Sequence, residues 1–207
     1  MMSKPSMDAT TLPVMERFYS VQGEGAFTGH AAFFIRLGGC DVGCVWCDVK
    51  DSWDANKHPF VHVQELIEEV KTSGAPICVV TGGEPTMHDL SQLTQGLQEL
   101  GIRTHLETSG TGSLTGSWDW ITFSPKKFKA PLDIYFERSH ELKVIVYHAS
   151  DISWAEELRM KSHSAMKCYL QPEWEKRTKS EALIFEYVRQ NPRWAISLQT
   201  HKYLGVD

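Results

Sequence analysis

Three cysteines stand close together in the segment 39–48, where Cys40, Cys44 and Cys47 are separated first by three residues and then by two. We call this segment the cysteine loop. Thiolate sulfur is a soft, polarisable donor, so closely spaced cysteines are typical of sites for zinc or an iron–sulfur cluster. The glycines within the segment let the backbone curl around such a group. The rest of the chain must therefore fold in a way that holds a metal-binding loop.

The number of ligands distinguishes the two kinds of metal site. A structural zinc ion is closed in by four ligands, usually two pairs of donors from two places in the chain. No second pair is present, because Cys78 and Cys168 each stand alone in an apolar run, where a cysteine usually packs as a small hydrophobic residue. A cubane cluster held by three cysteines keeps one iron open, and an open position is characteristic of catalytic metal sites. The spacing therefore favours a reactive cluster.

Length and charge narrow the class of protein. A chain of 207 residues is the size of one domain, and we expect a polar, flexible leader over 1–13 followed by a single domain over 14–207. The net charge of -5 argues against a nucleic-acid partner, although Lys126, Lys127 and Lys129 leave a local basic patch open.

No signal peptide or membrane-spanning stretch is expected from the sequence. Five cysteines, three of them in one loop, suit a reducing compartment better than a disulfide framework. The sequence therefore predicts a cytoplasmic protein that does not associate with a membrane.

Apolar runs typical of strands alternate with segments of helical periodicity along most of the chain. This alternation predicts parallel β–α units, and about six of them predict an incomplete TIM-type β/α barrel rather than the closed barrel of eight. The expected strands cover 31–37, 76–81, 103–108, 120–123, 142–146, 166–170 and 194–198, and the expected helices lie around 63–70, 90–100, 152–160 and 180–190.

Polar residues recur directly after these strands, as in Gly82-Gly83-Glu84, Ser124-Pro125-Lys126 and Gln171. The carboxyl ends of the strands of a β/α barrel meet on one face, which is where such folds build their active sites. We therefore expect these residues to share one site with the cysteine loop.

Two features of this face have structural and functional interpretations that the sequence leaves open. The glycines of the segment 18–25 are typical of a surface turn, but they also permit close approach of the backbone to a ligand. Arg36, inside an apolar strand, needs an anionic partner. That partner is either an internal carboxylate in a salt bridge or the carboxylate of a substrate.

The cysteine spacing, with Trp46 just before the last cysteine, resembles the signature of the radical S-adenosylmethionine (SAM) superfamily. The resemblance implies that the cysteines hold a 4Fe-4S cluster whose open iron chelates SAM, which is cleaved to a deoxyadenosyl radical. For two of the residues that would contact SAM, Glu107 and Lys126, an internal ion pair is the alternative role. The implied SAM contacts are Trp46, Cys47, Asp48, Gly82, Gly83, Glu84, Glu107, Ser109, Ser124, Pro125, Lys126 and Gln171.

Longer segments resemble the 7-carboxy-7-deazaguanine synthases within this superfamily. They are 20–25, 34–37, 46–48, 81–85, 106–110, 124–126 and 199–205. The resemblance implies rearrangement of 6-carboxy-5,6,7,8-tetrahydropterin to 7-carboxy-7-deazaguanine with loss of ammonia, in queuosine and deazapurine biosynthesis. SAM then acts as a regenerated cofactor. The implied substrate contacts are Val21, Gln22, Gly23, Arg36, Thr81 and His201.

The resemblance also implies magnesium, a homodimer and a reductant protein such as a flavodoxin. In the family a threonine after the Cys-Asp pair supplies a magnesium ligand, whereas this chain has Val49, so the way in which magnesium would be held stays open. Two rival functions are a radical SAM activase, which makes a glycyl radical on a partner protein, and a non-enzymatic zinc-binding module. The activase would have no use for Gln22, Arg36 and the histidine segment near the C-terminus.

Overall fold

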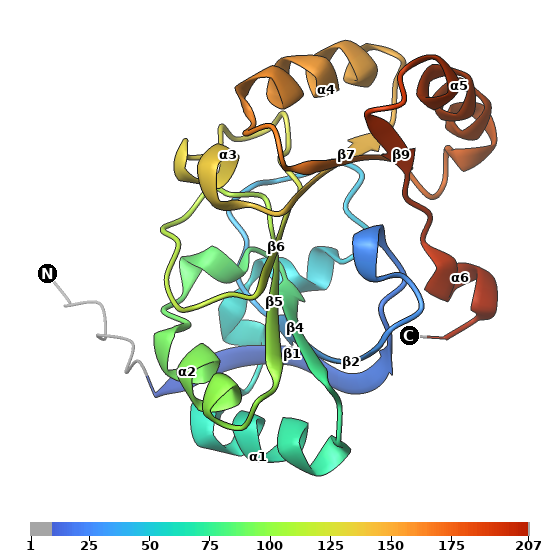
Figure 1. Ribbon diagram of the computed structural model, residues 1–207. Coiled ribbons are helices and arrows are strands. Elements are labelled where there is room, and N and C mark those ends of the chain that lie inside the picture. The colour runs from blue at the N-terminus through green and yellow to red at the C-terminus, as the bar shows by residue number, and fades with distance from the viewer. Residues whose placement is uncertain (1–9, 207) are drawn as a thin grey trace, which may run out of the picture.

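The computed structural model describes residues 10–206 and folds them around one curved sheet, with helices α1 to α5 arranged around its outside (Figure 1). The sheet has nine strands in the order β3-β1-β2-β4-β5-β6-β7-β8-β9. The strands are β1 (Thr11–Val21), β2 (Ala31–Leu37), β3 (Phe60–His62), β4 (Ile77–Gly82), β5 (Arg103–Thr108), β6 (Trp120–Phe123), β7 (Glu141–Val146), β8 (Lys167–Pro172) and β9 (Trp194–Ile196). The α-helices are α1 (Val63–Ser73), α2 (Ser91–Glu99), α3 (Ile134–Arg138), α4 (Ser150–Lys161), α5 (Arg177–Gln190) and α6 (Thr200–Leu204). Short 3-10 turns cover Gly25–Phe27, Lys50–Trp53, Ala55–Lys57 and Pro85–Met87.

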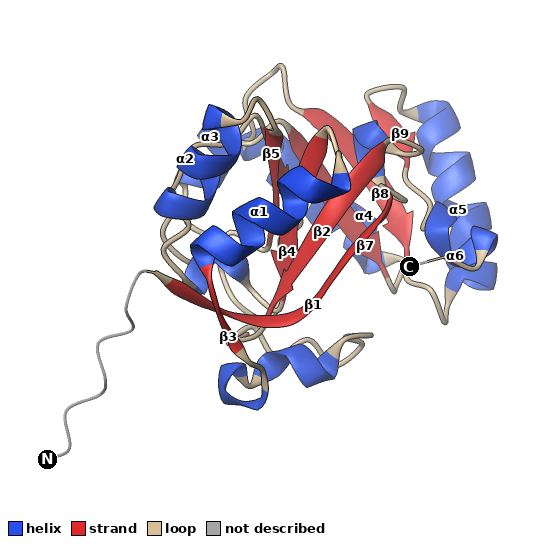
Figure 2. Ribbon diagram, turned by 90° about the horizontal axis from the view of Figure 1, so that it is seen from below, coloured by secondary structure: helices blue, strands red, loops and turns tan. Residues whose placement is uncertain are grey.

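Strand direction makes this sheet an incomplete barrel, as predicted. Each neighbouring pair from β2 to β9 is parallel, which makes seven parallel strands where the sequence suggested about six. Strands β1 and β3 continue the sheet in antiparallel fashion beyond β2. In the described part of the chain β3 and β9 end the sheet, so the barrel stays open between them (Figure 2).

The core lies between the outer face of the sheet and the helices. In α1, buried Val63, Leu66, Ile67 and Val70 recur at three- and four-residue spacing, which puts one apolar stripe against the sheet. Burying a side chain such as that of Leu66 contributes about 1.5–3 kcal/mol. The parallel strands are thereby held with their carboxyl ends at one edge of the sheet.

Strand β1 is the main element that the sequence did not predict. It begins at Thr11 and Leu12 is 2% exposed, so the structure places residues 11–13 in the sheet rather than in the expected leader, of which 1–9 lie outside the described residues. Three consecutive residues from Leu12 are buried, and a register shift follows Val14. A bulge of this kind breaks the alternation by which a strand is recognised in a sequence.

In residues 10–206, no helix is long and apolar enough to cross a bilayer.

Candidate active site

One cavity of about 500 Å³ opens at the carboxyl ends of the parallel strands, where barrels of this type place their active sites. It brings together the residues that the sequence singled out from eight separate segments, with two exceptions, Glu84 and Pro125, which do not line it. The predicted residues in its lining are Val21, Gln22, Gly23, Arg36, Cys40, Cys44, Trp46, Cys47, Asp48, Val49, Thr81, Gly82, Gly83, Glu107, Ser109, Ser124, Lys126, Gln171 and His201.

The cysteine loop follows β2 and forms one wall of the cavity. Its path is set by backbone hydrogen bonds, since Cys40 N donates to Trp53 O at 3.1 Å and Cys47 N donates to Cys44 O at 3.1 Å. All three cysteines are free thiols, and burial raises the pKa of Cys44 to about 11. Bound metal favours the thiolate over the thiol, so cluster binding would work against this preference.

The donor set of the loop fits a cluster that keeps one iron open, because three sulfur ligands face a cavity with room for a further ligand. Within residues 10–206 no three His, Cys, Asp or Glu side chains are grouped closely enough to hold one metal ion. The ligands of a cubane bind separate irons rather than one ion. Cys78 and Cys168 are buried in the core of the sheet, as expected for cysteines that pack as hydrophobic residues.

Glu84 is a structural residue rather than a side chain that faces the cavity. Its carboxylate is 1% exposed and accepts hydrogen bonds from Thr86 Oγ1 at 2.6 Å, from Ser109 N at 2.8 Å, and from the hydroxyls of Thr108 and Ser109. It therefore ties the loop after β4 to the end of β5. A contact of Glu84 with a cofactor, which the sequence resemblance implies, would therefore have to come from its backbone.

Gly83 is required where the loop after β4 passes the cysteine loop. A Cβ atom at this position would lie 2.2 Å from Gly39 O, so no larger residue fits without movement of the backbone. Gly83 N donates to Leu37 O at 2.9 Å and Glu84 N donates to Gly39 O at 2.8 Å, which fixes the two loops together. A cofactor at the cysteines would thus lie against the backbone of Gly82 and Gly83.

Lys126 approaches the cysteine loop from the segment after β6. Its ammonium donates to Ser124 Oγ at 2.7 Å and lies 6.0 Å from the centroid of the Trp46 ring. Burial lowers the pKa of Lys126. Of the other two lysines in the suspected basic patch, Lys127 pairs with Asp151 and Lys129 with Asp41, which neutralises much of its charge.

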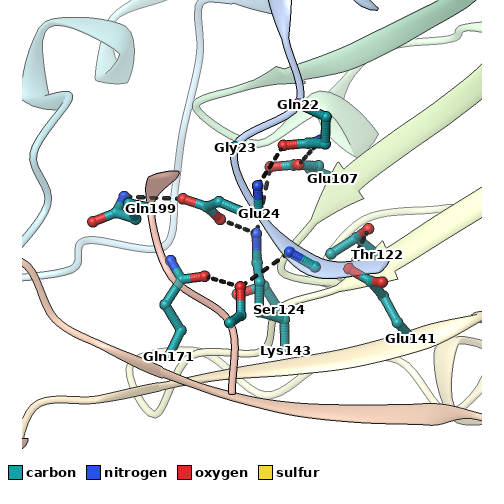
Figure 3. Close-up of polar contacts among 12 residues, drawn as sticks. Gln22, Gly23, Glu24, Glu107, Thr122, Ser124, Glu141, Lys143, Gln171 and Gln199 are labelled. Atoms are coloured by element: carbon teal, nitrogen blue, oxygen red, sulfur yellow. Dashed lines mark hydrogen bonds and ion pairs between the residues drawn. The ribbon is translucent and has the colours of Figure 1, made fainter. Parts of the chain in front are cut away.

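Three charged residues in the lining of the cavity form a cluster. The sequence did not indicate that they lie together. Lys143 of β7 donates to Glu24 and lies 3.7 Å from Glu107 Oε2, and its side chain is 4% exposed (Figure 3). We call Glu24, Glu107 and Lys143 the buried charge cluster. A lysine within the apolar run 142–146 was the available signal, because a charge in a buried strand needs a partner.

The pKa values of the cluster are set by burial and by the opposite charges. Burial alone would raise the pKa of Glu24, but the charge and hydrogen bond of Lys143 lower it to about 2. Burial alone would lower the pKa of Lys143, but the charges of Glu107 and Glu24 raise it. Both partners of the ion pair are therefore charged at neutral pH.

Glutamine side chains hold the two carboxylates in place. Gln22 Nε2 donates to Glu107 Oε1 at 2.9 Å, and Gln22 Oε1 accepts from Glu24 N at 3.0 Å. Gln199 Nε2 donates to Glu24 Oε1 at 2.9 Å (Figure 3). Gln171 Oε1 accepts from Ser197 Oγ at 2.7 Å. The expected internal ion pair of Glu107 is thus present, and Gln22 is already engaged with protein groups.

Arg36 has the internal carboxylate partner that one of the two sequence interpretations requires. Its Nε lies 2.6 Å from Glu16 Oε1, an internal ion pair across the β1–β2 register, and the residue also lines the cavity. Only one side of the guanidinium is used by Glu16. A planar guanidinium with free N–H groups can still bind a carboxylate.

The C-terminal segment lies against the glycine turn after β1. Thr200 N and Thr200 Oγ1 each donate to Gly23 O at 2.9 Å, and Lys202 Nζ lies 2.8 Å from Asp48 Oδ2 in the cysteine loop. Helix α6 therefore links the turn to the cysteine loop and places His201 in the lining. Burial lowers the pKa of His201.

Comparison with known proteins places this arrangement in a family. Residues 34–121 match the family model of the radical SAM superfamily. A 7-carboxy-7-deazaguanine synthase from Flavobacterium psychrophilum is 50% identical to this chain, covering 94% of this chain and 92% of the relative. The enzyme of that name from Escherichia coli K12 is 34% identical, covering 94% and 98%.

This chain belongs to the 7-carboxy-7-deazaguanine synthase family. The crystal structure of QueE from Escherichia coli supports the same conclusion, with a TM-score of 0.81 at 32% identity, covering 91% of this chain and 93% of that chain. The family resemblance seen in the sequence is thereby confirmed.

Val49 stands where the sequence resemblance implies a magnesium ligand, and it lines the cavity but offers no oxygen from its side chain. Its carbonyl oxygen accepts from Ser52 Oγ at 2.6 Å. The neighbouring carboxylate, Asp48, is engaged by Lys202. The side chain at position 49 therefore does not fit a hydroxyl-ligated magnesium site.

Proposed function

We propose that this chain is a radical SAM enzyme that rearranges 6-carboxy-5,6,7,8-tetrahydropterin into 7-carboxy-7-deazaguanine with release of ammonia, in queuosine biosynthesis. The observation that carries the proposal is one cavity in which three free thiols on a loop face a cluster of buried carboxylates. When bound at the thiols, a 4Fe-4S cluster and SAM supply an organic radical that removes hydrogen from a substrate. The cavity then has to bind and orient that substrate.

The charges that line the cavity are complementary to a carboxylated pterin. Arg36 supplies a guanidinium for the carboxylate. Glu24 supplies an acceptor for the ring N–H groups, since an ionised carboxylate only accepts hydrogen bonds. Thr81 and His201 add polar contacts, and Val21, Gln22 and Gly23 supply backbone at the edge of the ring. Arg36 would thus fix the carboxylate end of the ligand, and the ionised glutamate would fix its N–H edge, within one cavity.

The remaining predicted residues surround the place where SAM would lie against the cysteine loop. Gly82 and Gly83 offer backbone carbonyls to the ammonium of the methionine moiety. Trp46 offers an aromatic face to the adenine. The other proposed contacts are Cys47, Asp48, Glu107, Ser109, Ser124, Pro125, Lys126 and Gln171, with Pro125 acting through the backbone since it does not line the cavity.

Several features of the proposed enzyme rest on the family alone. A reductant protein such as a flavodoxin would deliver the electron, the enzyme would act as a homodimer in the cytoplasm, and neither nucleic acid nor membrane is a partner. For magnesium, water would take the place of the hydroxyl that Val49 lacks, because magnesium keeps several waters in most protein sites.

Anaerobic reconstitution tests the proposal against its rivals. Iron and sulfide in a ratio that fits one 4Fe-4S cluster would exclude the zinc module. Deoxyadenosine formation from SAM should then be stimulated by the tetrahydropterin. Formation that is stimulated only by a partner protein would instead indicate an activase and contradict the proposal.

A further inference from the structure

The buried lysine of the charge cluster has no role among the contacts proposed so far. Lys143 projects from β7, its side chain is 4% exposed, and it makes an ion pair with Glu24 whose side chain is 12% exposed. A buried ion pair is weak evidence for a contribution to stability, because removing two charges from water costs about as much as their attraction returns. Stability alone therefore does not account for the presence of this ion pair.

Glu24 is held from two sides. Lys143 Nζ contacts Oε2, while Gln199 Nε2 donates to Oε1 at 2.9 Å (Figure 3). Each carboxylate oxygen can accept more than one hydrogen bond, so both retain acceptor capacity toward the cavity. The carboxylate is thus fixed in position and still able to bind a donor.

We propose that Lys143 is a positioning residue that keeps Glu24 ionised and oriented as the acceptor for the N–H edge of the heterocyclic substrate. This inference rests on the proposed function and deepens it, because it names the residue that sets recognition of the ring. Lys143 acts through Glu24 rather than by contact with the reacting atoms.

Every charged group that faces Glu24 is relevant to its protonation. Lys143 of β7 and Glu107 of β5 belong to the cluster, and the more distant Glu141, His201 and Lys126 also act on its members. Of these, Lys143 is the only cation in direct contact with Glu24 among the described residues. Its charge and hydrogen bond lower the pKa of that carboxyl more than the hydrogen bonds of Gln199 and Gln171 do. Removing Lys143 leaves burial, which favours the neutral acid, opposed only by the two glutamines.

A neutral Glu24 would present an O–H donor to a ring edge that also carries donors. Affinity for the substrate would then fall as the pH falls through the raised pKa of Glu24. In the wild type the pKa of Glu24 is about 2, so the carboxylate stays ionised across the working range and adds no pH dependence to binding. The pH profile of binding therefore separates this role from a merely structural one.

The test measures binding without turnover. Protein with its reconstituted cluster and SAM, kept anaerobic and without reductant, is titrated with 6-carboxy-5,6,7,8-tetrahydropterin between about pH 6 and about pH 8, and tryptophan fluorescence reports the Kd. Lys143→Met should raise the Kd by about tenfold at the upper pH, equivalent to about 1.4 kcal/mol, and by more as the pH falls. Lys143→Arg should restore most of the affinity, and SAM binding should not change.

Lys167→Met is the matched control. Lys167 lies on the neighbouring strand β8, is exposed, and has its ammonium 5.7 Å from the Trp120 ring rather than against a carboxylate of the cluster. Its variant should bind the pterin as the wild type does at every pH. The Kd of each variant is divided by that of the wild type at the same pH. Effects on binding that come from titration of His201 or of the ligand are common to both proteins and cancel in this ratio.

Lys143→Met leaves Glu24 buried without its cation and can unfold for that reason, so a second pair of variants is included. If Lys143 acts through Glu24, the double variant Glu24→Gln/Lys143→Met should bind as weakly as Glu24→Gln alone, and both should be insensitive to pH. A further large loss in the double variant would show that Lys143 acts on the ligand directly or through Glu107, 3.7 Å from its ammonium, and not through Glu24, which would overturn the inference.

The outcomes also separate this inference from the proposed function. A wild type that does not bind the pterin would defeat both. A wild type that binds it, together with a Lys143→Met variant whose Kd ratio is close to one at all pH values, would overturn only the role of Lys143.

Discussion

The cysteine loop is built from neighbours in the chain, whereas the buried charge cluster is assembled from distant segments. The three cysteines lie within residues 39–48, outside any regular strand or helix. Glu24, by contrast, meets Lys143 across 119 positions and Gln199 across 175. Chemistry that is carried by local spacing can be recognised in a sequence, but chemistry that depends on the closing of a barrel can be seen only in the fold.

The two regions also differ in how far their ion pairs are buried. In the cysteine loop, Asp41 and Asp48 make ion pairs at exposed sites, where such pairs contribute about 0–1 kcal/mol. In the charge cluster the partners are almost fully covered, so removing one leaves an uncompensated charge. The folding stability of the chain should therefore change little when the ion pair of Asp41 or Asp48 is lost, but should fall when either partner of the cluster is removed.

The largest expected effect is loss of the cluster ligands. Cys44→Ser should abolish SAM cleavage and lower iron and sulfide content, with little loss of folding stability because Cys44 does not belong to the hydrophobic core of the sheet. The measurement is metal content together with deoxyadenosine formation after reconstitution.

Cys78→Ala is the matched control for this variant. Cys78 is fully buried in the sheet, so its truncation should cost about 1 kcal/mol of unfolding free energy and leave the metal content unchanged. SAM cleavage retained by Cys44→Ser would refute the cluster assignment.

Acid unfolding probes the charge cluster. The folded pKa of Glu24 is about 2, below the ordinary glutamate value of 4.5, so its contribution to stability is complete above the unfolded pKa and is lost as the pH falls through the folded value. This loss should be on the order of 3 kcal/mol between about pH 5 and pH 2. Denaturant unfolding of wild type beside Glu24→Gln should show the difference in unfolding free energy shrinking over that window.

Glu141 supplies a contrast within the same region. Burial raises the pKa of this carboxyl, so its protonated form is favoured in the folded state and the wild type should gain stability relative to Glu141→Gln as the pH falls. If the unfolding free energies of the two variants, each relative to the wild type, depended on pH in the same way, the opposite pKa shifts of Glu24 and Glu141 would be contradicted.

Arg36 joins the two regions because it lies on β2, directly before the cysteine loop, and lines the cavity. Arg36→Lys should weaken pterin binding by about 1.5–3 kcal/mol, because an ammonium cannot reproduce two parallel hydrogen bonds to a carboxylate. SAM binding should be unaffected. The measurement is the KM for the pterin beside the Kd for SAM.

Arg17→Lys is the control, since Arg17 on β1 pairs with Glu65 and Glu69 and does not line the cavity. It should change only thermal stability. An Arg36→Lys enzyme that loses thermal stability but keeps its KM would assign Arg36 to the ion pair with Glu16 alone.

The smallest expected effect concerns Val49. Val49→Thr adds a hydroxyl beside the cavity and should lower the magnesium concentration needed for half-maximal turnover, because magnesium prefers oxygen ligands. Val45→Thr makes the same chemical change at a residue that is 69% exposed, and should leave the curve unchanged. Strong activation with superimposable magnesium curves for wild type and Val49→Thr would show that residue 49 is not part of a metal site.

The sequence predicted most of the fold because the parallel strands are apolar and are bounded by helices or glycines. The predicted strands 31–37, 103–108 and 120–123 agree with β2, β5 and β6. Strand β1 was missed, because Pro13 is atypical of a strand interior and the bulge after Val14 breaks the alternation. Helix α6 was missed because a helix of five residues carries too little periodicity to be recognised.

The site was predicted where motifs are local and missed where the fold supplies the partner. Glu84 was predicted as a cofactor contact, and the sequence did not show that its side chain is occupied, because the hydroxyls that bind its carboxylate belong to β5 and its following loop, 24 and 25 positions away. Lys143 was recognised only as part of a strand. Its significance depends on which carboxylates the barrel brings to it.

The most direct test of the central claim is to identify the product of the reconstituted wild-type enzyme. Protein with its reconstituted 4Fe-4S cluster is incubated anaerobically with SAM, a reductant and 6-carboxy-5,6,7,8-tetrahydropterin. The products are separated by chromatography and identified by mass spectrometry. We predict 7-carboxy-7-deazaguanine and ammonia in equal amounts, with SAM recovered. Pterin returned unchanged, while SAM is consumed to deoxyadenosine, would contradict the assignment of this cavity to ring contraction.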